Sequence, residues 1–266
     1  IPEETLAYQT TDIMMALEYA DTFARSFSRP VIFCIALSSS YGSHSGNSPL
    51  SNYINRLANK RSRVFVVGGG NEGNSLHHYE GNLSSENGDQ TEREEEIEIR
   101  VGERERGFIT EIWARTPNVF SLSIRSPGGE DIPNTGVQAN RGIEYEFVYE
   151  RTNITVSYAL VEGNNGDELI TVRFQNPTPG IWTLILQSES GLRNAEFHIW
   201  LPISQFLSSE TYFLSPNPDI TLTLPSYAEN VITVSAYSDK NNSIYVRSGR
   251  GFSRGSEIKP DISAPA

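Results

Sequence analysis

Three consecutive glycines followed by an asparagine form the stretch of this sequence that is best suited to chemistry. The apolar run at residues 64–67 is typical of a buried strand, and Gly68, Gly69, Gly70 and Asn71 follow it directly. Because glycine has no Cβ, a ligand or another chain can approach the backbone closely there. A side-chain amide at that point can donate a hydrogen bond to an oxygen that gains negative charge during a reaction. The pattern predicts an oxyanion-hole donor at Asn71, with a plain glycine-rich turn as the alternative.

The elements that precede the glycines predict how the asparagine is held. Apolar residues at helical spacing predict a helix over residues 11–27. The apolar run at residues 31–37 is typical of a strand that is buried on both faces, as in a parallel sheet. Ser48 and Pro49 are residue types that begin helices, so a second helix should precede the strand before the glycines. Helix, strand, helix and strand in this order predict an α/β part over residues 1–81.

The middle of the chain has a different pattern. Residues 96–202 show no helical period but many short β-rich runs, separated by turn signals such as Pro-Gly-Gly at residues 127–129. This pattern predicts an all-β jelly roll or sandwich, which we assign to residues 82–215. The α/β pattern resumes over residues 216–266. The expected fold class is therefore α/β, a parallel sheet with helices that is interrupted by an all-β insertion.

Composition excludes several classes of protein. The chain has 266 residues, a formal net charge of -12 and a pI of about 4.8, which argues against a nucleic-acid-binding surface. No apolar run reaches the length of a membrane span, and no signal peptide is visible. The only cysteine, Cys34, excludes an internal disulfide and is expected to be a small core residue.

Three segments, in order along the chain, resemble subtilisin-like serine peptidases, the subtilases. Residues 68–74 resemble the segment that carries the oxyanion asparagine of that family. Residues 227–236 resemble its "Val-Ile-x-Val-x-Ala" strand, and residues 259–265 match "Lys-Pro-Asp-Ile-x-Ala-Pro". The resemblance covers residues 10–79 and 220–265 and implies a serine endopeptidase that acts on peptides or proteins.

The resemblance also implies roles for individual residues. Asn71 would hold the oxyanion, and no cofactor would be needed. The substrate would lie against two short segments: Ala36, Leu37 and Ser38 would pair with its backbone, and Gly68, Gly69 and Gly70 would line a pocket. The family often binds structural calcium, and the chain offers three aspartates for such sites, although the spacing specifies none: Asp219, Asp239 and Asp261.

The motifs that carry the catalytic aspartate, histidine and serine of a subtilase do not occur in this sequence. We therefore expect a central piece of a longer protease, with the isolated chain inactive. The insertion after Asn71, the loop at 40–46 and the run at 73–79 resemble the clostridial Csp germination proteases. That resemblance implies a spore-associated or intracellular bacterial protein, whereas other subtilases are secreted. The rival hypothesis is a non-catalytic pseudopeptidase or binding module whose jelly roll recognises a protein or a glycan. The oligomeric state stays open.

The four histidines are expected to lie at the surface or at the rim of a cleft and to bind no metal. His77 and His78 are adjacent, so in an extended segment they point in opposite directions, and no carboxylate or cysteine stands at ligand spacing. We expect a surface or cleft-rim pair there and no metal site. His44 lies in a polar loop and should be solvated, and His198 should face solvent from a strand.

Overall fold

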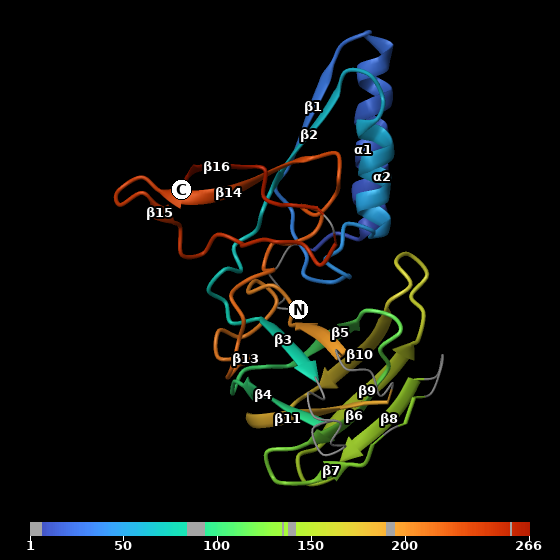
Figure 1. The fold of residues 1–266 in the computed structure, drawn as a ribbon, viewed down its shortest axis with the longest axis vertical. Coiled ribbons are helices and arrows are strands. Elements are labelled where there is room, and N and C mark those ends of the chain that lie inside the picture. Colours follow the sequence, from blue (N-terminus) through green and yellow to red (C-terminus); the bar gives the residue numbers. More distant parts are fainter. Residues whose placement is uncertain (1–6, 84–93, 135, 138–141, 190–194, 256) are drawn as a thin grey trace. The chain divides into compact units, whose positions relative to one another are not determined.

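Figure 1 shows the chain in a computed structural model, in which the chain forms two compact units. The structure describes residues 7–83, 94–134, 136–137, 142–189, 195–255 and 257–266. Pro2–Asn74 and Asp219–Ala266 make up one unit, which we call the helix unit, and Ser75–Pro218 make up the other, the β unit. Among the described residues, no helix is long and apolar enough to cross a membrane.

The helix unit begins with two successive pairs of a helix and a strand. These elements are α1 (Thr10–Ser26), β1 (Val31–Ile35), α2 (Pro49–Ala58) and β2 (Arg63–Gly68). The Ser48 side chain caps α2, because its oxygen accepts a hydrogen bond from the Ser51 backbone N–H at 3.1 Å. Both helices and both strands that the sequence predicts before the glycines are confirmed, close to their expected positions.

The helix unit is completed by a small sheet that is mostly parallel. The later strands are β14 (Ile232–Ser238), β15 (Ser243–Ile244) and β16 (Ile262–Pro265). The parallel pairs are β1 with β2, β2 with β14 and β14 with β16, and β15 pairs with β14 in the antiparallel sense. β1 therefore forms an edge of the sheet.

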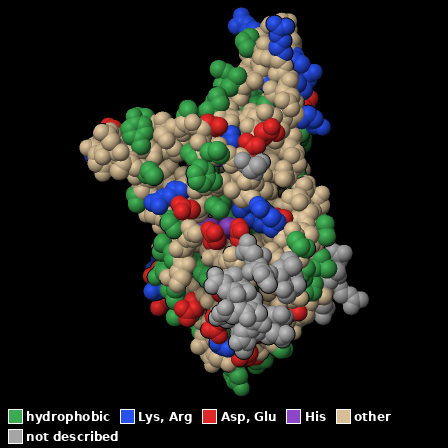
Figure 2. All heavy atoms as spheres, in the orientation of Figure 1, with side chains coloured by type: hydrophobic (Ala, Val, Ile, Leu, Met, Phe, Trp, Pro, Cys, Tyr) green, Lys and Arg blue, Asp and Glu red, His purple; other side chains and the backbone are tan. Residues whose placement is uncertain are grey.

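The sheet buries one face only. Phe33, Ile35, Phe65 and Val67 point into a core that also contains side chains of α1 and α2. The opposite face carries exposed apolar side chains, some of which are visible over β1 and β2 in Figure 2. These are Ile32, Val64, Ile232 and Ile262, with Cys34 among them. The predictions that residues 31–37 are buried on both faces and that Cys34 is a core residue were therefore wrong, because burial alternates along β1.

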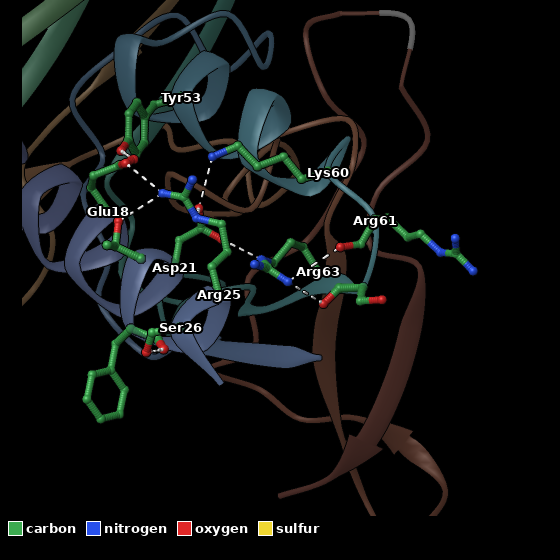
Figure 3. Close-up of polar contacts among 11 residues, drawn as sticks. Glu18, Asp21, Arg25, Ser26, Tyr53, Lys60, Arg61 and Arg63 are labelled. Carbon is green, nitrogen blue, oxygen red and sulfur yellow. Dashed lines mark hydrogen bonds and ion pairs between the residues drawn. The ribbon is translucent and has the colours of Figure 1, made fainter. Parts of the chain in front are cut away.

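A cluster of ion pairs joins α1 to the start of β2 (Figure 3). The Asp21 carboxylate has no exposed side-chain area and accepts hydrogen bonds from Arg63 and from Lys60, the latter at 2.9 Å. Arg25 lies 3.3 Å away. Burial alone would raise the pKa of Asp21, but the hydrogen bonds and charges of Arg63 and Lys60 outweigh it and hold that pKa below its ordinary value.

The β unit consists of two antiparallel sheets. One has the strand order β3-β12-β5-β10-β9-β8, and the other has the order β13-β4-β11-β6-β7. Their bounds are β3 (His78–Leu83), β4 (Glu94–Val101), β5 (Gly107–Ala114), β6 (Phe120–Arg125), β7 (Asp131–Ile132), β8 (Gly142–Phe147), β9 (Thr152–Ala159), β10 (Glu168–Gln175), β11 (Gly180–Ser188), β12 (Ala195–Trp200) and β13 (Tyr212–Phe213).

Alternating apolar residues from both sheets form a single core in the β unit. Trp182 of β11 is fully buried and meets two rings of the other sheet edge-on, Phe147 at 5.0 Å and Phe174 at 5.5 Å between ring centroids. The indole N–H donates to the Thr178 carbonyl at 2.9 Å, so burial leaves it satisfied. The short β-rich runs of the sequence thus form strands that share one core.

The expected fold class, an α/β protein with a parallel sheet and helices, was wrong. The described chain is mostly β, with 40% of residues in strands and 11% in two helices. Helical periodicity is confined to residues 10–58, and after Asp219 the described residues contain strands and loops without a helix. The α/β pattern belongs to the first part of the chain, whereas the long β-rich stretch determines the class of the whole chain.

Candidate functional site

The glycine run at the end of β2 is held by backbone hydrogen bonds to three distant segments of the helix unit. Gly69 N–H donates to the Val234 carbonyl at 2.9 Å, and the Gly69 carbonyl accepts from Thr223 N–H at 3.1 Å. The Gly70 carbonyl accepts from Gly249 N–H at 3.0 Å. Strand β14 and the loops around residues 223 and 249 therefore fix the backbone that leads into Asn71.

Close packing explains why glycines are needed here. Gly70 has a φ of +87°, and a Cβ on it would lie 2.3 Å from Thr223 Oγ1. A Cβ on Gly73 would lie 2.0 Å from the Ser248 carbonyl oxygen. By contrast, a Cβ on Gly68 would meet nothing within 4 Å. Other parts of this chain thus fill the space beside Gly70 and Gly73. Of these three glycines, only Gly68 has open space beside it.

Asn71 is exposed at the end of this rigid loop. The structure shows no hydrogen bond from its side-chain amide to any other residue that it describes. The following residues, Glu72 and Gly73, are buried, and Gly73 N–H donates to the Arg247 carbonyl at 3.1 Å. An exposed amide between two anchored stretches of backbone is available to donate a hydrogen bond to a bound molecule.

The segment Ala36, Leu37 and Ser38 is brought next to the glycines. β1 and β2 are parallel neighbours in register, with Ile35 opposite Val67, so residues 36–38 and 68–70 leave the sheet at the same end. All three residues of this segment are exposed. The chain is then anchored by a backbone pair between Ser39 and Leu224, at 2.8 and 3.2 Å. The sequence-predicted site residues at the carboxyl ends of β1 and β2 therefore lie together on the helix unit.

The loop at residues 40–46, between β1 and α2, is packed rather than solvated. His44 is 1% exposed, and its Nε2 lies 2.9 Å from the Ser40 carbonyl oxygen. Its ring meets Tyr227 edge-on at 5.1 Å, and its own carbonyl accepts from Arg254 N–H at 3.0 Å. The prediction of a solvated His44 was therefore wrong, because contacts with Tyr227 and Arg254, which are distant in the sequence, bury it.

The segment at residues 259–265 is an internal anchor. Lys259 is buried, and its Nζ donates to the Val231 carbonyl and to Asp261 Oδ2, both at 2.9 Å. The same Asp261 oxygen accepts from Thr233 N–H at 2.7 Å. Asp261, which the sequence analysis considers for a calcium site, thus orders the ends of β14 and β16 through a lysine and a backbone amide. The structure brings neither Asp219 nor Asp239 into a group of potential metal ligands among the described residues.

Three other histidines lie in the β unit, and their predicted exposure was wrong. His77 is 7%, His78 0% and His198 1% exposed. His78 and His198 stack with Trp200 at 4.7 and 5.3 Å between ring centroids. The antiparallel pairing of β3 with β12 creates this cluster by placing His198 opposite Glu80 and Trp200 opposite His78. The sequence does contain a signal for this cluster. His78 and Glu80 are two positions apart, as are Glu196 and His198, and in a strand this spacing places both side chains on the same face.

Comparisons with known proteins identify the class of fold. A scan against protein families finds no match, and neither does a search of curated proteins. Among solved structures, the chain is similar to a protease at a TM-score of 0.86 and 30% sequence identity. That structure is the CspB protease of Clostridium perfringens.

The similarity spans 97% of this chain and 52% of the CspB chain. The chain thus spans about half the length of that protease, and its fold is protease-like over nearly all of its residues.

Proposed function

We propose that this chain is the central part of a longer subtilisin-like serine endopeptidase that hydrolyses peptide bonds. The observation that carries the proposal is the similarity to the CspB protease, which extends through both units of the chain. The catalytic aspartate, histidine and serine of such an enzyme would come from the parts of the protein that flank this chain. The germination-protease group is the subgroup that this similarity favours, and with it a spore-associated or intracellular bacterial location.

In this proposal Asn71 donates to the oxyanion. The glycine loop supports the role, because Gly69, Gly70 and Gly73 are tied to other backbone segments on both sides of Asn71. A donor held by a rigid backbone needs little reorganisation when charge develops on the carbonyl oxygen, which is the source of oxyanion stabilisation. The serine would attack that carbonyl after a histidine takes its proton, so that an acyl-enzyme forms and the amine leaves.

The segment at residues 36–38 and the glycines would bind substrate on either side of this donor. β1 is an edge strand, so a peptide can add to the sheet beside residues 36–38 by main-chain hydrogen bonds. Gly68 has open space where a side chain would be, which leaves room for the substrate residue before the scissile bond. No cofactor is needed for this chemistry.

The uncovered apolar face of the parallel sheet supports a longer parent protein. Parallel sheets are almost always covered on both faces, yet Ile32, Val64 and Ile262 are exposed here at 71%, 41% and 54%. Flanking parts of the protease that complete the fold would cover this face and place the catalytic serine near Asn71.

The test compares the intact protein with the isolated chain, using a fluorophosphonate probe that reacts with activated serines. The proposal expects labelling at a serine outside this chain in the intact protein, with cleavage of casein, and no labelling of the chain by itself. If the intact protein is folded but neither labels nor cleaves, the chain belongs to a pseudopeptidase or a binding protein. Labelling of a serine within residues 1–266 would also overturn the proposed division of the active site.

A further inference from the structure

A histidine and two glutamates converge on one point at the surface of the β unit. The imidazole Nε2 of His198 lies 2.9 Å from Glu196 Oε1, and a Glu80 oxygen completes a group of ligand atoms within 4.8 Å of one another. His198 and Glu196 belong to β12, and Glu80 belongs to the neighbouring strand β3, directly opposite His198. We propose that these three side chains form a binding site for a divalent transition-metal ion of the Zn²⁺ type.

The surroundings of His198 direct its Nε2 toward the carboxylates. His78 Nε2 lies 3.1 Å from His198 Nδ1, and both rings are buried and stacked within 10° of parallel. When His198 donates its Nδ1 proton to His78, its Nε2 carries the lone pair that a metal needs. Metal-binding histidines are oriented in this way by a partner on the other ring nitrogen.

Glu80 is oriented as well. Asn217 Nδ2 donates to Glu80 Oε2 at 2.7 Å, and Asn217 N–H donates to the His78 carbonyl at 2.8 Å. The loop that contains Asn217 thus holds both the carboxylate and the strand that carries it. A ligand carboxylate that is itself hydrogen-bonded is the usual arrangement in metal sites.

The donor set indicates the type of metal. One imidazole nitrogen and two carboxylate oxygens suit Zn²⁺, which binds such ligands at about 2.0–2.2 Å and leaves a fourth position to water. Ligand atoms of a tetrahedral site are then about 3.4 Å apart. The ligand atoms now lie within 4.8 Å of one another. Because the side chains of Glu80 and Glu196 are partly exposed, small rotations can bring their oxygens to the shorter separation of about 3.4 Å. Calcium and magnesium prefer sites made only of oxygen, so they fit this group less well.

A metal at this point would join two strands that are far apart in sequence. Among the described strands of its sheet, β3 lies at the edge and pairs with β12 alone. A bound ion would add a second link between these strands, through residues 80 and 198. An ion that binds only the folded state stabilises that state, and the stabilisation grows with the logarithm of the free-ion concentration once this exceeds the Kd. This inference does not depend on the proposed protease activity.

The experiment measures thermal unfolding of the chain, first stripped of metal with a chelator and then in Zn²⁺ at about 100 times its Kd. The proposal predicts that Zn²⁺ raises the Tm by about 5–10 °C. E80Q and E196Q keep the shape of each side chain and remove its charge, so each should fold normally and lose most of that shift. E144Q replaces an exposed glutamate of β8 in the same sheet and should retain the full shift.

Calorimetric titration with Zn²⁺ provides a second readout, in which E80Q and E196Q should each weaken binding by at least about tenfold. His198→Gln is the third ligand variant. Because His198 is buried, this change can also disturb folding, so the two glutamate variants are the decisive ones. Absence of a Zn²⁺ shift in the unmodified chain would overturn the proposal, and the contact between His198 and Glu196 would be a structural hydrogen bond. An equal shift in E80Q, E196Q and E144Q would also overturn it.

Discussion

Replacement of Asp21 by asparagine tests how the helix unit is held together. Asp21 has no exposed side-chain area and Arg63 only 6%, whereas Lys60 and Arg25 are 39% and 52% exposed. Asp21→Asn removes the charge that compensates the buried guanidinium of Arg63 and keeps the side-chain volume. Loss of one member of a buried ion pair costs about 3–5 kcal/mol. The backbone carbonyls of Arg61 and Ser62 also accept from Arg63, at 3.4 and 3.2 Å, so we expect about 3 kcal/mol.

Glu18, on the same helix, provides the matched control. Its ion pair with Arg25 measures 3.5 Å, and the two side chains are 50% and 52% exposed. Exposed pairs of this kind contribute about 0–1 kcal/mol, so Glu18→Gln should have a small effect. Glutamine can also still accept the hydrogen bond that Tyr53 donates to Glu18 at 2.7 Å.

Urea unfolding followed by the far-UV helix signal is the appropriate assay, because both helices lie in the helix unit. All three tryptophans lie in the β unit, so their fluorescence reports that unit separately. Because the folded-state pKa of Asp21 is lowered from its ordinary value, the stabilisation by Asp21 is present above the unfolded pKa and is lost as the pH falls through the folded pKa. With Asp21→Asn, the free energy of unfolding should therefore fall less steeply as the pH is lowered. An Asp21→Asn variant as stable as Glu18→Gln at neutral pH would refute this reasoning.

Two further predictions concern buried groups in each unit. Burial raises the pKa of Glu168 to about 8, although its carboxylate accepts from Phe120 N–H at 2.9 Å. The contribution of Glu168 to the stability of the β unit should therefore be fully present below about pH 4.5 and fall by up to about 3–5 kcal/mol as the pH rises to 8. Glu168→Gln should abolish that decline in Tm, and an unchanged decline would exclude Glu168 as its cause. In the helix unit, Gly70→Ala should destabilise by about 1–3 kcal/mol or more in urea unfolding, whereas Gly68→Ala should change stability by less than about 1 kcal/mol. Equal effects of the two changes would contradict the packing seen at Gly70.

Local signals in the sequence predicted the elements of the helix unit. Periodicity and the Ser48–Pro49 start placed both helices, and the apolar runs placed β1 and β2, because these features depend on neighbouring residues. The burial of β1 could not be read in the same way. The apolar run at residues 31–37 would read the same whether one face of the strand or both were covered, and the exposure of Ile32 and Cys34 depends on the rest of the sheet.

The histidine and glutamate cluster of the β unit depends on long-range strand pairing, which the sequence does not specify. His78 and Glu80 share one face of a strand, and so do Glu196 and His198, but their meeting depends on the pairing of β3 with β12. More than a hundred residues separate these strands, and no local pattern specifies the partner of a strand. His44 and Lys259 illustrate the same limit. Tyr227 and Arg254 pack against His44, and the Val231 carbonyl accepts a hydrogen bond from Lys259.

The central claim is that Asn71 stabilises the oxyanion in an intact serine protease. The most direct measurement is steady-state kinetics of Asn71→Ala in the intact protein on its best peptide substrate, with folding verified by thermal melting. The account predicts that kcat falls by about 10²–10³ while KM changes little, because the hydrogen bond forms only in the transition state. If kcat stays within a few-fold of the unmodified enzyme and KM rises sharply, Asn71 binds substrate instead, and the oxyanion must have another donor.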